Sequence, residues 1–282
     1  MLSALAWLLV VLLALPVEPP PAGTESSPPA IGQRISSGGV NTRTGSFSMG
    51  RTDVQLRGPG IVFSRTYNSN DTRVGSLGPG WTHSYAMRLV DPGDGSDAVV
   101  LVGPEGRSDR YTRLPSGEYA PPPGVSTLLT MQADGTFRAT TRDQTVFEFD
   151  GGGRLTAIVD RFGVAIPLSY DEAGALVSIG DALRGATLAL EYDTETGRLV
   201  AVGLTDDPVR TTFAYDSLGR LIAVTDRTGA TTAYTYDGDS QRITTIANAL
   251  GIVVLTNTYD DQGRVIGQTD AVGATTSYEY GR

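Results

Sequence analysis

The sequence predicts an all-β protein built from antiparallel hairpin repeats, and three observations support this prediction. A short motif recurs in which an aromatic residue and Asp are followed by Gly, Arg and an aliphatic residue, as in the stretch from Tyr215 to Leu221. The motif aromatics are separated by 21 to 23 residues, a period that indicates a repeat architecture. The 282 residues include 35 Gly and 16 Pro, as expected of many turns between short strands.

One unit of the repeat, residues 215–235, predicts two turns and two strands. The turns are Asp216–Gly219 and Asp226–Gly229, where Asp can bond the backbone two residues on and Gly allows a positive φ. The runs 220–225 and 230–236 alternate and are rich in β-branched and aromatic residues. An isolated hairpin is marginally stable in water, so the units must stack. We therefore expect an open, coiled antiparallel sheet.

The repeat residues that we expect to form this structural motif are the aromatic, the Asp and the Gly of each clear copy. We expect the aromatic residue to pack and the Asp and Gly to make the turn. These residues are Tyr192, Asp193, Gly197, Tyr215, Asp216, Gly219, Tyr259, Asp260 and Gly263.

The first 34 residues differ from the rest. Residues 1–17 form an apolar run of a length that suits a signal peptide, although the basic residues that usually precede such a run are missing. We expect export through this helix, with an uncleaved membrane anchor as the alternative. Residues 18–34 are rich in Pro, Ser and Gly and predict an extended linker.

Residues 35–148 predict a β domain that leads into the repeats of residues 149–282. In the run "IVFSRTY", Ile61, Phe63, Arg65 and Tyr67 share one strand face. Strand-like runs follow at 98–102, 109–113, 128–131, 136–141 and 145–149, most of them bounded by Gly, Pro or Asp. The "PPPG" of residues 121–124 should interrupt the sheet or lie at its edge.

The ordered segments "FSRTYN" at 63–68 and "LGPGWTHSY" at 77–85 resemble the N-terminal domain of Rhs and wall-associated YD-repeat proteins. The downstream repeats match the YD repeats of the same family, so the resemblance covers residues 36–282. It implies a partial YD-repeat shell that would enclose a C-terminal toxin domain, encoded by the same gene or an adjacent one. The family-like residues of the N-terminal segments, which we expect to be structural, are Arg65, Tyr67, Asn68, Gly80, Trp81 and His83.

Composition excludes several classes of function. The net charge of −9 disfavours nucleic-acid binding. The chain has no Cys and only one His, His83, which excludes thiolate sites and the HExxH zinc pattern. The acidic stretch at 91–97 lacks EF-hand spacing. We therefore predict no metal, no cofactor and no catalytic residue, and a hydrolase is disfavoured because no acid/base pair stands out.

Two non-enzymatic functions remain open. The first is a structural scaffold, the N-terminal part of an exported protein whose shell delivers a toxin. Because a partial further motif stands at Tyr280–Arg282, we expect the array to continue in this gene or an adjacent one.

The alternative is a cell-surface module that binds carbohydrate or a partner through one sheet face. In this alternative the repeat arginines form a binding ladder, whereas structurally they would pair with the Asp of their own turns. The weak candidates for such a ladder are Arg198, Arg220, Arg264, Tyr234 and Tyr236.

Overall fold

The computed structural model describes residues 36, 38–56 and 60–281, and within these residues every regular element is a β-strand. The predicted signal or anchor helix at 1–17 and the linker at 18–34 lie outside the described residues. Within the described part of the chain, no helix is long and apolar enough to cross a membrane. The predicted all-β class is therefore confirmed.

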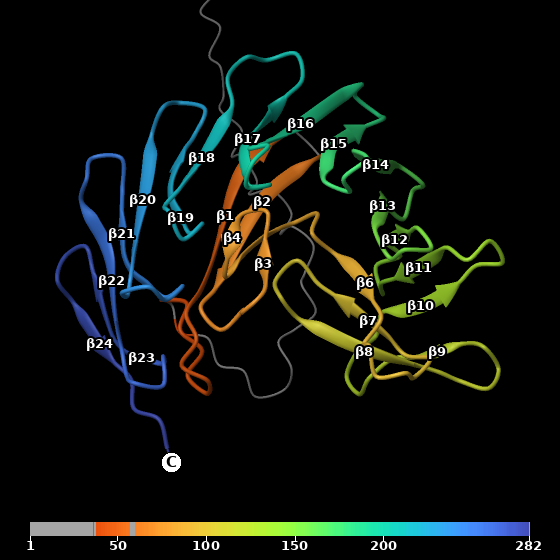
Figure 1. Cartoon of the computed structure of the whole chain (residues 1–282), viewed down its shortest axis with the longest axis horizontal. Helices are drawn as coiled ribbons and strands as arrows, with labels where there is room; N and C mark the ends of the chain where they lie inside the picture. Colours follow the sequence, from red (N-terminus) through yellow and green to blue (C-terminus); the bar gives the residue numbers. More distant parts are fainter. Residues whose placement is uncertain (1–35, 37, 57–59, 282) are drawn as a thin grey trace, which may run out of the picture.

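A small N-terminal sheet lies at the centre of the molecule (Figure 1). Its strands are β1 (Ser48–Gln55), β2 (Val62–Asn68) and β5 (Trp81–His83), in the order β1-β2-β5 and all antiparallel. A short hairpin of β3 (Val74–Gly75) and β4 (Gly78–Pro79) precedes β5. Burial alternates along β2 as the sequence predicts, and every second side chain from Ile61 to Tyr67 is buried.

The rest of the chain forms one long antiparallel strip in which each strand pairs with the next, from β6 to β24. Its strands are β6 (Arg88–Val90), β7 (Val99–Val102), β8 (Ser108–Arg113), β9 (Tyr119–Ala120), β10 (Leu128–Met131), β11 (Phe137–Thr140), β12 (Val146–Phe149), β13 (Leu155–Val159), β14 (Ala165–Tyr170), β15 (Leu176–Asp181), β16 (Ala186–Tyr192), β17 (Leu199–Leu204), β18 (Thr211–Tyr215), β19 (Leu221–Thr225), β20 (Thr231–Tyr236), β21 (Ile243–Ala247), β22 (Val253–Tyr259), β23 (Val265–Asp270) and β24 (Thr275–Ser277).

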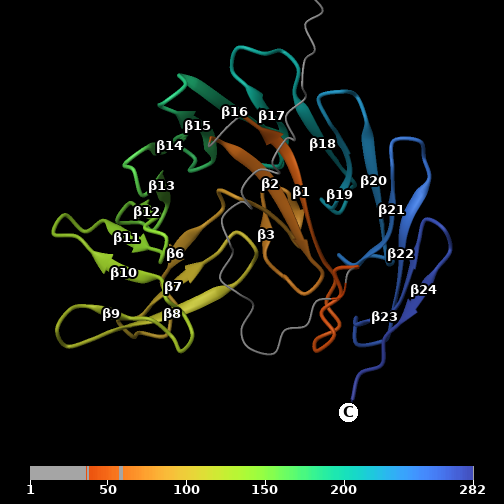
Figure 2. The same ribbon diagram turned by 180° about the vertical axis from the view of Figure 1, so that it is seen from behind.

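The strip is an open sheet that arches around the N-terminal strands (Figures 1 and 2). Among the described residues, β24 pairs with β23, and no strand register joins β24 to β6. An isolated bridge between Arg88 of β6 and Arg154 joins the first strand of the strip to the turn just before β13. The "PPPG" stretch falls in the loop between β9 and β10, which pair with each other, so it lies at an edge of the sheet, the second of the two predicted placements.

The turns of the strip alternate between its two long edges. One edge, which we call the YD rim, carries the turns that follow the motif aromatics, from 150–154 to 260–264. The other edge, the opposite rim, carries the second turn of each unit, from 160–164 to 270–274. The strand register shifts by one residue next to each motif aromatic, for example between Ala214 and Tyr215. Such bulges bend a strand and increase its twist.

The concave face of the strip and the N-terminal sheet share one hydrophobic core. Phe63, Tyr67 and Trp81 of the sheet belong to the same buried cluster as Leu221 and Ile243 of the strip. These side chains are at most 2% exposed. The YD rim thus lies against the N-terminal residues, and the chemistry of this contact defines the candidate site.

Candidate functional site

The motif tyrosines connect one repeat to the one before it. The hydroxyl of Tyr236 donates a hydrogen bond of 2.6 Å to the carbonyl oxygen of Leu221, the aliphatic residue that ends the preceding motif. Tyr215 and Tyr259 make the same bond to Leu199 and Ile243, at 2.6 and 2.7 Å. The equivalent pairs elsewhere are Tyr170 with Leu155, Tyr192 with Leu176 and Tyr280 with Val265. A ladder of hydroxyl groups therefore crosses the strip.

Burial keeps these hydroxyl groups protonated. It raises the pKa of Tyr170 to about 12, and it raises the pKa of Tyr215, Tyr236 and Tyr259 further. At neutral pH each hydroxyl is therefore a proton donor to the carbonyl group that it faces. This arrangement suits a structural ladder better than acid–base chemistry.

The motif arginines complete the joint between repeats. Arg220 Nε lies 2.7 Å from the carboxylate of Asp216 in its own turn, and its guanidinium lies 4.8 Å from the ring centre of Tyr236 in the next unit. Arg264 repeats this with Asp260 at 2.8 Å and with Tyr280 at 4.9 Å. Arg154 and Arg242 likewise pair with Asp150 and Asp237. Each such arginine contacts two successive units.

Arg198 departs from this pattern. The carboxylate of Asp193 accepts hydrogen bonds from the amide and hydroxyl of Thr196, whereas Arg198 Nη1 donates to the carbonyl oxygen of Gly75 at 2.6 Å. Arg198 therefore ties the strip to the N-terminal hairpin instead of to its own turn.

Tyr67 and Trp81 dock the N-terminal sheet on the YD rim. The Tyr67 hydroxyl donates to the carbonyl of Gln241 at 2.8 Å and accepts from the amide of Ile243 at 3.1 Å. Trp81 Nε1 donates to the Tyr236 hydroxyl at 3.2 Å, and its ring lies edge-on to Tyr234 with centroids 5.2 Å apart. Both candidate binding tyrosines of this repeat therefore contact Trp81.

A buried ion pair lies beneath these aromatic rings. The guanidinium of Arg65 pairs with the carboxylate of Asp53, and both side chains are at most 4% exposed. Arg65 Nη2 also donates to the Tyr234 hydroxyl at 2.9 Å, and its guanidinium lies 5.6 Å from the Trp81 ring centre. Arg65 thus links the N-terminal sheet to the strip through Tyr234. Removing its charge would leave Asp53 buried without its ion-pair partner.

Main-chain bonds extend the docking along the whole rim. The amide of Leu199 donates to the carbonyl of Ser76, and the amide of Val265 donates to that of Gly45, both at 2.9 Å. At the far end the amide of Leu89, in the first strand of the strip, donates to the carbonyl of Gly153 at 2.8 Å. Gly78 faces Gly219 so closely that a Cβ on it would lie 2.4 Å from the Gly219 carbonyl oxygen. The approach therefore requires glycine there.

The remaining predicted motif residues lie in turns of the same assembly. The main-chain amide of Asn68 donates a hydrogen bond to the Gly80 carbonyl at 2.9 Å, and Gly80 has φ +75°. Gly197, Gly219 and Gly263 have φ of +67° to +76°, the left-handed region that favours glycine. The structural roles that we expected for these residues stay predictions. The proposed carbohydrate ladder through Arg198, Arg220 and Arg264 stays a prediction.

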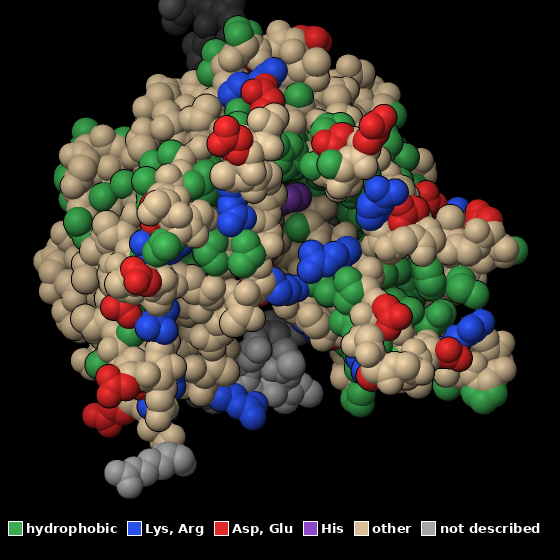
Figure 3. All heavy atoms as spheres, in the orientation of Figure 1, with side chains coloured by type: hydrophobic (Ala, Val, Ile, Leu, Met, Phe, Trp, Pro, Cys, Tyr) green, Lys and Arg blue, Asp and Glu red, His purple; other side chains and the backbone are tan. Residues whose placement is uncertain are grey.

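His83 lies at the floor of a cleft between the N-terminal sheet and the strip. It stacks on Phe63 with centroids 5.2 Å apart, and its Nδ1 accepts the Tyr85 amide at 3.3 Å. Burial lowers the pKa of His83 to about 4, so the ring is neutral at physiological pH. Figure 3 shows the purple histidine at the bottom of this hollow.

Sequence reasoning missed some docking residues that depart from the repeat. Gln241 occupies the position of the motif glycine, and its Nε2 donates to the carbonyls of Ser69 and Asp71 at 2.9 and 2.7 Å. Gln268 Nε2 donates to the carbonyl oxygen of Gly38 and to Oδ1 of the buried Asn257. Gln241 in place of an expected glycine was a visible signal, but its partners lie 170 and 172 residues away.

Comparison with known proteins identifies the repeat region. Residues 126–278, more than half of the chain, match the family model described as the Teneurin YD-shell. The chain belongs to this family. Residues 37–111 match a separate domain of unknown function, DUF6531. These matches support the predicted Rhs/YD-repeat protein.

The relatives of known name are much longer proteins. The chain is 34% identical over 145 residues to the "tRNA3(Ser)-specific nuclease WapA" of Bacillus spizizenii, which covers 50% of this chain and 6% of the relative. It is 37% identical over 176 residues to the "Double-stranded DNA deaminase toxin A" of Burkholderia cenocepacia, covering 59% and 12%. Among solved structures, TcdB2-TccC3 without its hypervariable C-terminal region aligns with a TM-score of 0.35 and 16% identity, over 78% of this chain and 14% of that one.

Proposed function

We propose that this chain is the non-enzymatic first part of a protein shell that encloses and delivers a C-terminal toxin domain. The observation that carries the proposal is the strip itself, which curves in one direction and has one rim fixed to the N-terminal sheet (Figure 1). A strip of this kind can extend by adding units, because Tyr280 already bonds Val265 and stacks under Arg264 as earlier motif tyrosines do.

The named relatives support a toxin as the enclosed partner. Two of them are called a nuclease and a deaminase toxin, and the match to this chain covers 6% and 12% of their length. The part that it shares with them is the shell-like part. We therefore assign the chemistry in those names to other regions and a scaffold role to this one. Export follows from the same proposal, with residues 1–17 as the signal or anchor.

The test uses the natural product of the gene, purified from its host under native conditions and treated with a protease. Mass spectrometry should find a toxin-like domain that resists cleavage while the β-strip is intact and is cut once denaturant opens the strip. Cleavage of that domain at the same rate with and without denaturant would contradict enclosure. Binding to a glycan array would instead support the carbohydrate alternative.

A further inference from the structure

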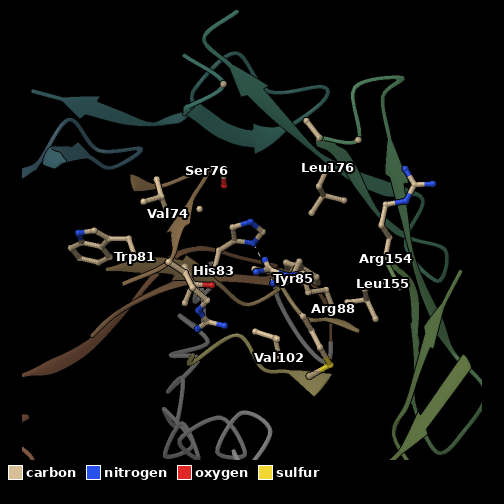
Figure 4. A pocket seen from close by; sticks show the side chains of 18 of the residues that line it. Val74, Ser76, Trp81, His83, Tyr85, Arg88, Val102, Arg154, Leu155 and Leu176 are labelled. Atoms are coloured by element: carbon tan, nitrogen blue, oxygen red, sulfur yellow. Dashed lines mark hydrogen bonds between the residues drawn. The ribbon is translucent and has the colours of Figure 1, made fainter. Parts of the chain in front are cut away.

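The cleft above His83 has a volume of about 500 Å³ and lies between two layers that are far apart in sequence. Figure 4 shows Trp81, His83 and Tyr85 on one side and Arg154, Leu155 and Leu176 on the other. The volume falls within the range of about 300–1,000 Å³ that is typical of ligand pockets. The tyrosine ladder and the docking bonds account for the contact between the layers but not for this opening.

The charges around the cleft are opposite in sign to the protein as a whole. Four arginines and one carboxylate line it: Arg73, Arg88, Arg154 and Arg198, with Asp71. Arg73 is held by Asp71 at 2.7 Å and Arg154 by Asp150 at 2.8 Å, and Glu105 lies near Arg73. The net charge of the whole chain is −9. A positive opening on such a protein attracts an anion to one place.

Arg73 and Arg154 form close ion pairs, whereas the other two arginines form none within the described part of the chain. Arg198 is the repeat arginine that donates to Gly75 instead of to its own Asp193. Arg88 is exposed, and its charge helps to lower the pKa of the Asp71 carboxyl, whose side-chain hydrogen bonds go to Arg73. Figure 3 shows several blue side chains around the mouth of the hollow. The cleft therefore presents two cationic groups that are available to a ligand.

The walls between these arginines are apolar. Val74, Val102, Leu155 and Leu176 line the cleft together with the ring of Trp81 (Figure 4). The lining offers few neutral hydrogen-bonding side chains, namely Ser76, Thr82, His83 and Thr196 with the aromatic hydroxyls. A sugar polymer would leave many of its hydroxyl groups unpaired there, which is costly. A peptide that combines carboxylates with aliphatic side chains fits both the charge and the walls.

We propose that this cleft binds a short acidic segment of a polypeptide, with carboxylates on Arg88 and Arg198 and an aliphatic side chain between Val74 and Leu176. Guanidinium groups suit this role because they bind carboxylates in a bidentate manner. The inference assigns a ligand class to the cleft and does not depend on the enclosure of a toxin.

The test measures fluorescence anisotropy of a labelled peptide of alternating Glu and Leu, titrated with the full chain at low salt. A matched peptide with Gln in place of Glu is the control, and an oligogalacturonate is the competing anion. We expect the acidic peptide to bind, the Gln peptide to bind at least tenfold more weakly, and binding to weaken as salt rises. Equal binding of both peptides, or tighter binding of the sugar acid, would overturn the proposal.

A pair of variants locates the site. Arg88→Gln should weaken peptide binding about tenfold, and the fold should survive because Arg88 is exposed and Asp71 keeps its ion pair with Arg73. Arg51→Gln removes the same charge from an exposed position on β1 that does not line the cleft, and it should bind as the unaltered chain does. Equal weakening by both variants would show general attraction between charges and would contradict a site in the cleft.

Discussion

The two rims of the strip use the same turn but differ in what surrounds it. On both rims an aspartate carboxylate accepts hydrogen bonds from backbone amides of its turn. Asp216 accepts from the amide of Leu218 on the YD rim, and Asp226 accepts from the amide of Thr228 on the opposite rim. A glycine with positive φ ends each of these turns. The YD rim adds a tyrosine before the turn and an arginine after it. The described turns of the opposite rim have no tyrosine before them and expose apolar side chains, such as Leu250 and Val272, although Arg227 there pairs with Asp207 of the preceding unit. Asp and Gly therefore specify turn geometry, whereas Tyr and Arg join units.

The rims also differ in strand register. On the YD rim a shift occurs at six successive motif aromatics, from Phe149 to Tyr259. On the opposite rim the described strands show one, between Ile246 and Ala247. Extra residues along one edge bend a sheet in a constant direction. The rim that docks on the N-terminal sheet is thus also the rim that sets the curvature of the strip.

The largest expected effect comes from the ion pair beneath the docked rim. Arg65→Met leaves the Asp53 carboxylate buried and unpaired, so we expect the free energy of unfolding of the full chain to fall by about 3–5 kcal/mol in urea. The double variant Arg65→Met/Asp53→Leu should recover most of this loss, because it removes the orphaned charge. A single variant as stable as the unaltered chain would show that the two layers are not locked there.

A matched pair of glycines compares the rims directly. Gly153 on the YD rim and Gly163 on the opposite rim have φ of +83° and +82°. A Cβ at 153 would lie 2.2 Å from the Leu89 carbonyl oxygen, whereas a Cβ at 163 meets nothing within 4 Å. Gly163→Ala should therefore cost about 1–2 kcal/mol, and Gly153→Ala about 1–3 kcal/mol more. Thermal unfolding of both variants checks this, and equal losses would argue against docking at Leu89.

His83 makes the docked side sensitive to acid. Its pKa is lowered by burial from the ordinary 6.5 to about 4, so between these values the unfolded chain binds the proton more readily. Stability is therefore lost as pH falls from 6.5 to 4, by about 3 kcal/mol in total. In urea titrations across this range, His83→Phe should lose less stability than the unaltered chain. Parallel pH profiles for the two proteins would contradict a neutral buried ring.

The smallest of these effects separates the two roles of a motif tyrosine. Tyr236 bonds both Leu221 and Trp81, whereas Tyr170 bonds only Leu155 within the strip. We expect Tyr236→Phe to cost about 1–3 kcal/mol and Tyr170→Phe about 1 kcal/mol. The difference between the two denaturation midpoints measures the contribution of docking. If Tyr170→Phe lowers the free energy of unfolding more than Tyr236→Phe does, the bond between Tyr236 and Trp81 adds no stability and the prediction fails.

Local patterns predicted the strands and turns well, because a period of two and an Asp–Gly turn are short-range signals. The predicted run at 128–131 coincides with β10, and the alternation in "IVFSRTY" matches the burial of β2. The docking was not predictable in this way. Tyr67 meets Ile243 across 176 residues, and neither local sequence carries a sign of the other. The alternation along β2 showed that one of its faces packs but not against which rim.

Hydrogen exchange at three strip amides tests the central claim most directly, namely that the YD rim is fixed to the N-terminal residues. The amides of Leu199, Ile243 and Val265 donate to Ser76, Tyr67 and Gly45 rather than to a neighbouring strand. If the rim is docked, these amides should exchange only through global unfolding, and Tyr67→Phe should speed exchange at Ile243 far more than at Leu199 or Val265. Exchange at these amides as fast as at the opposite-rim turn amides of Thr228 and Leu250 would contradict the account.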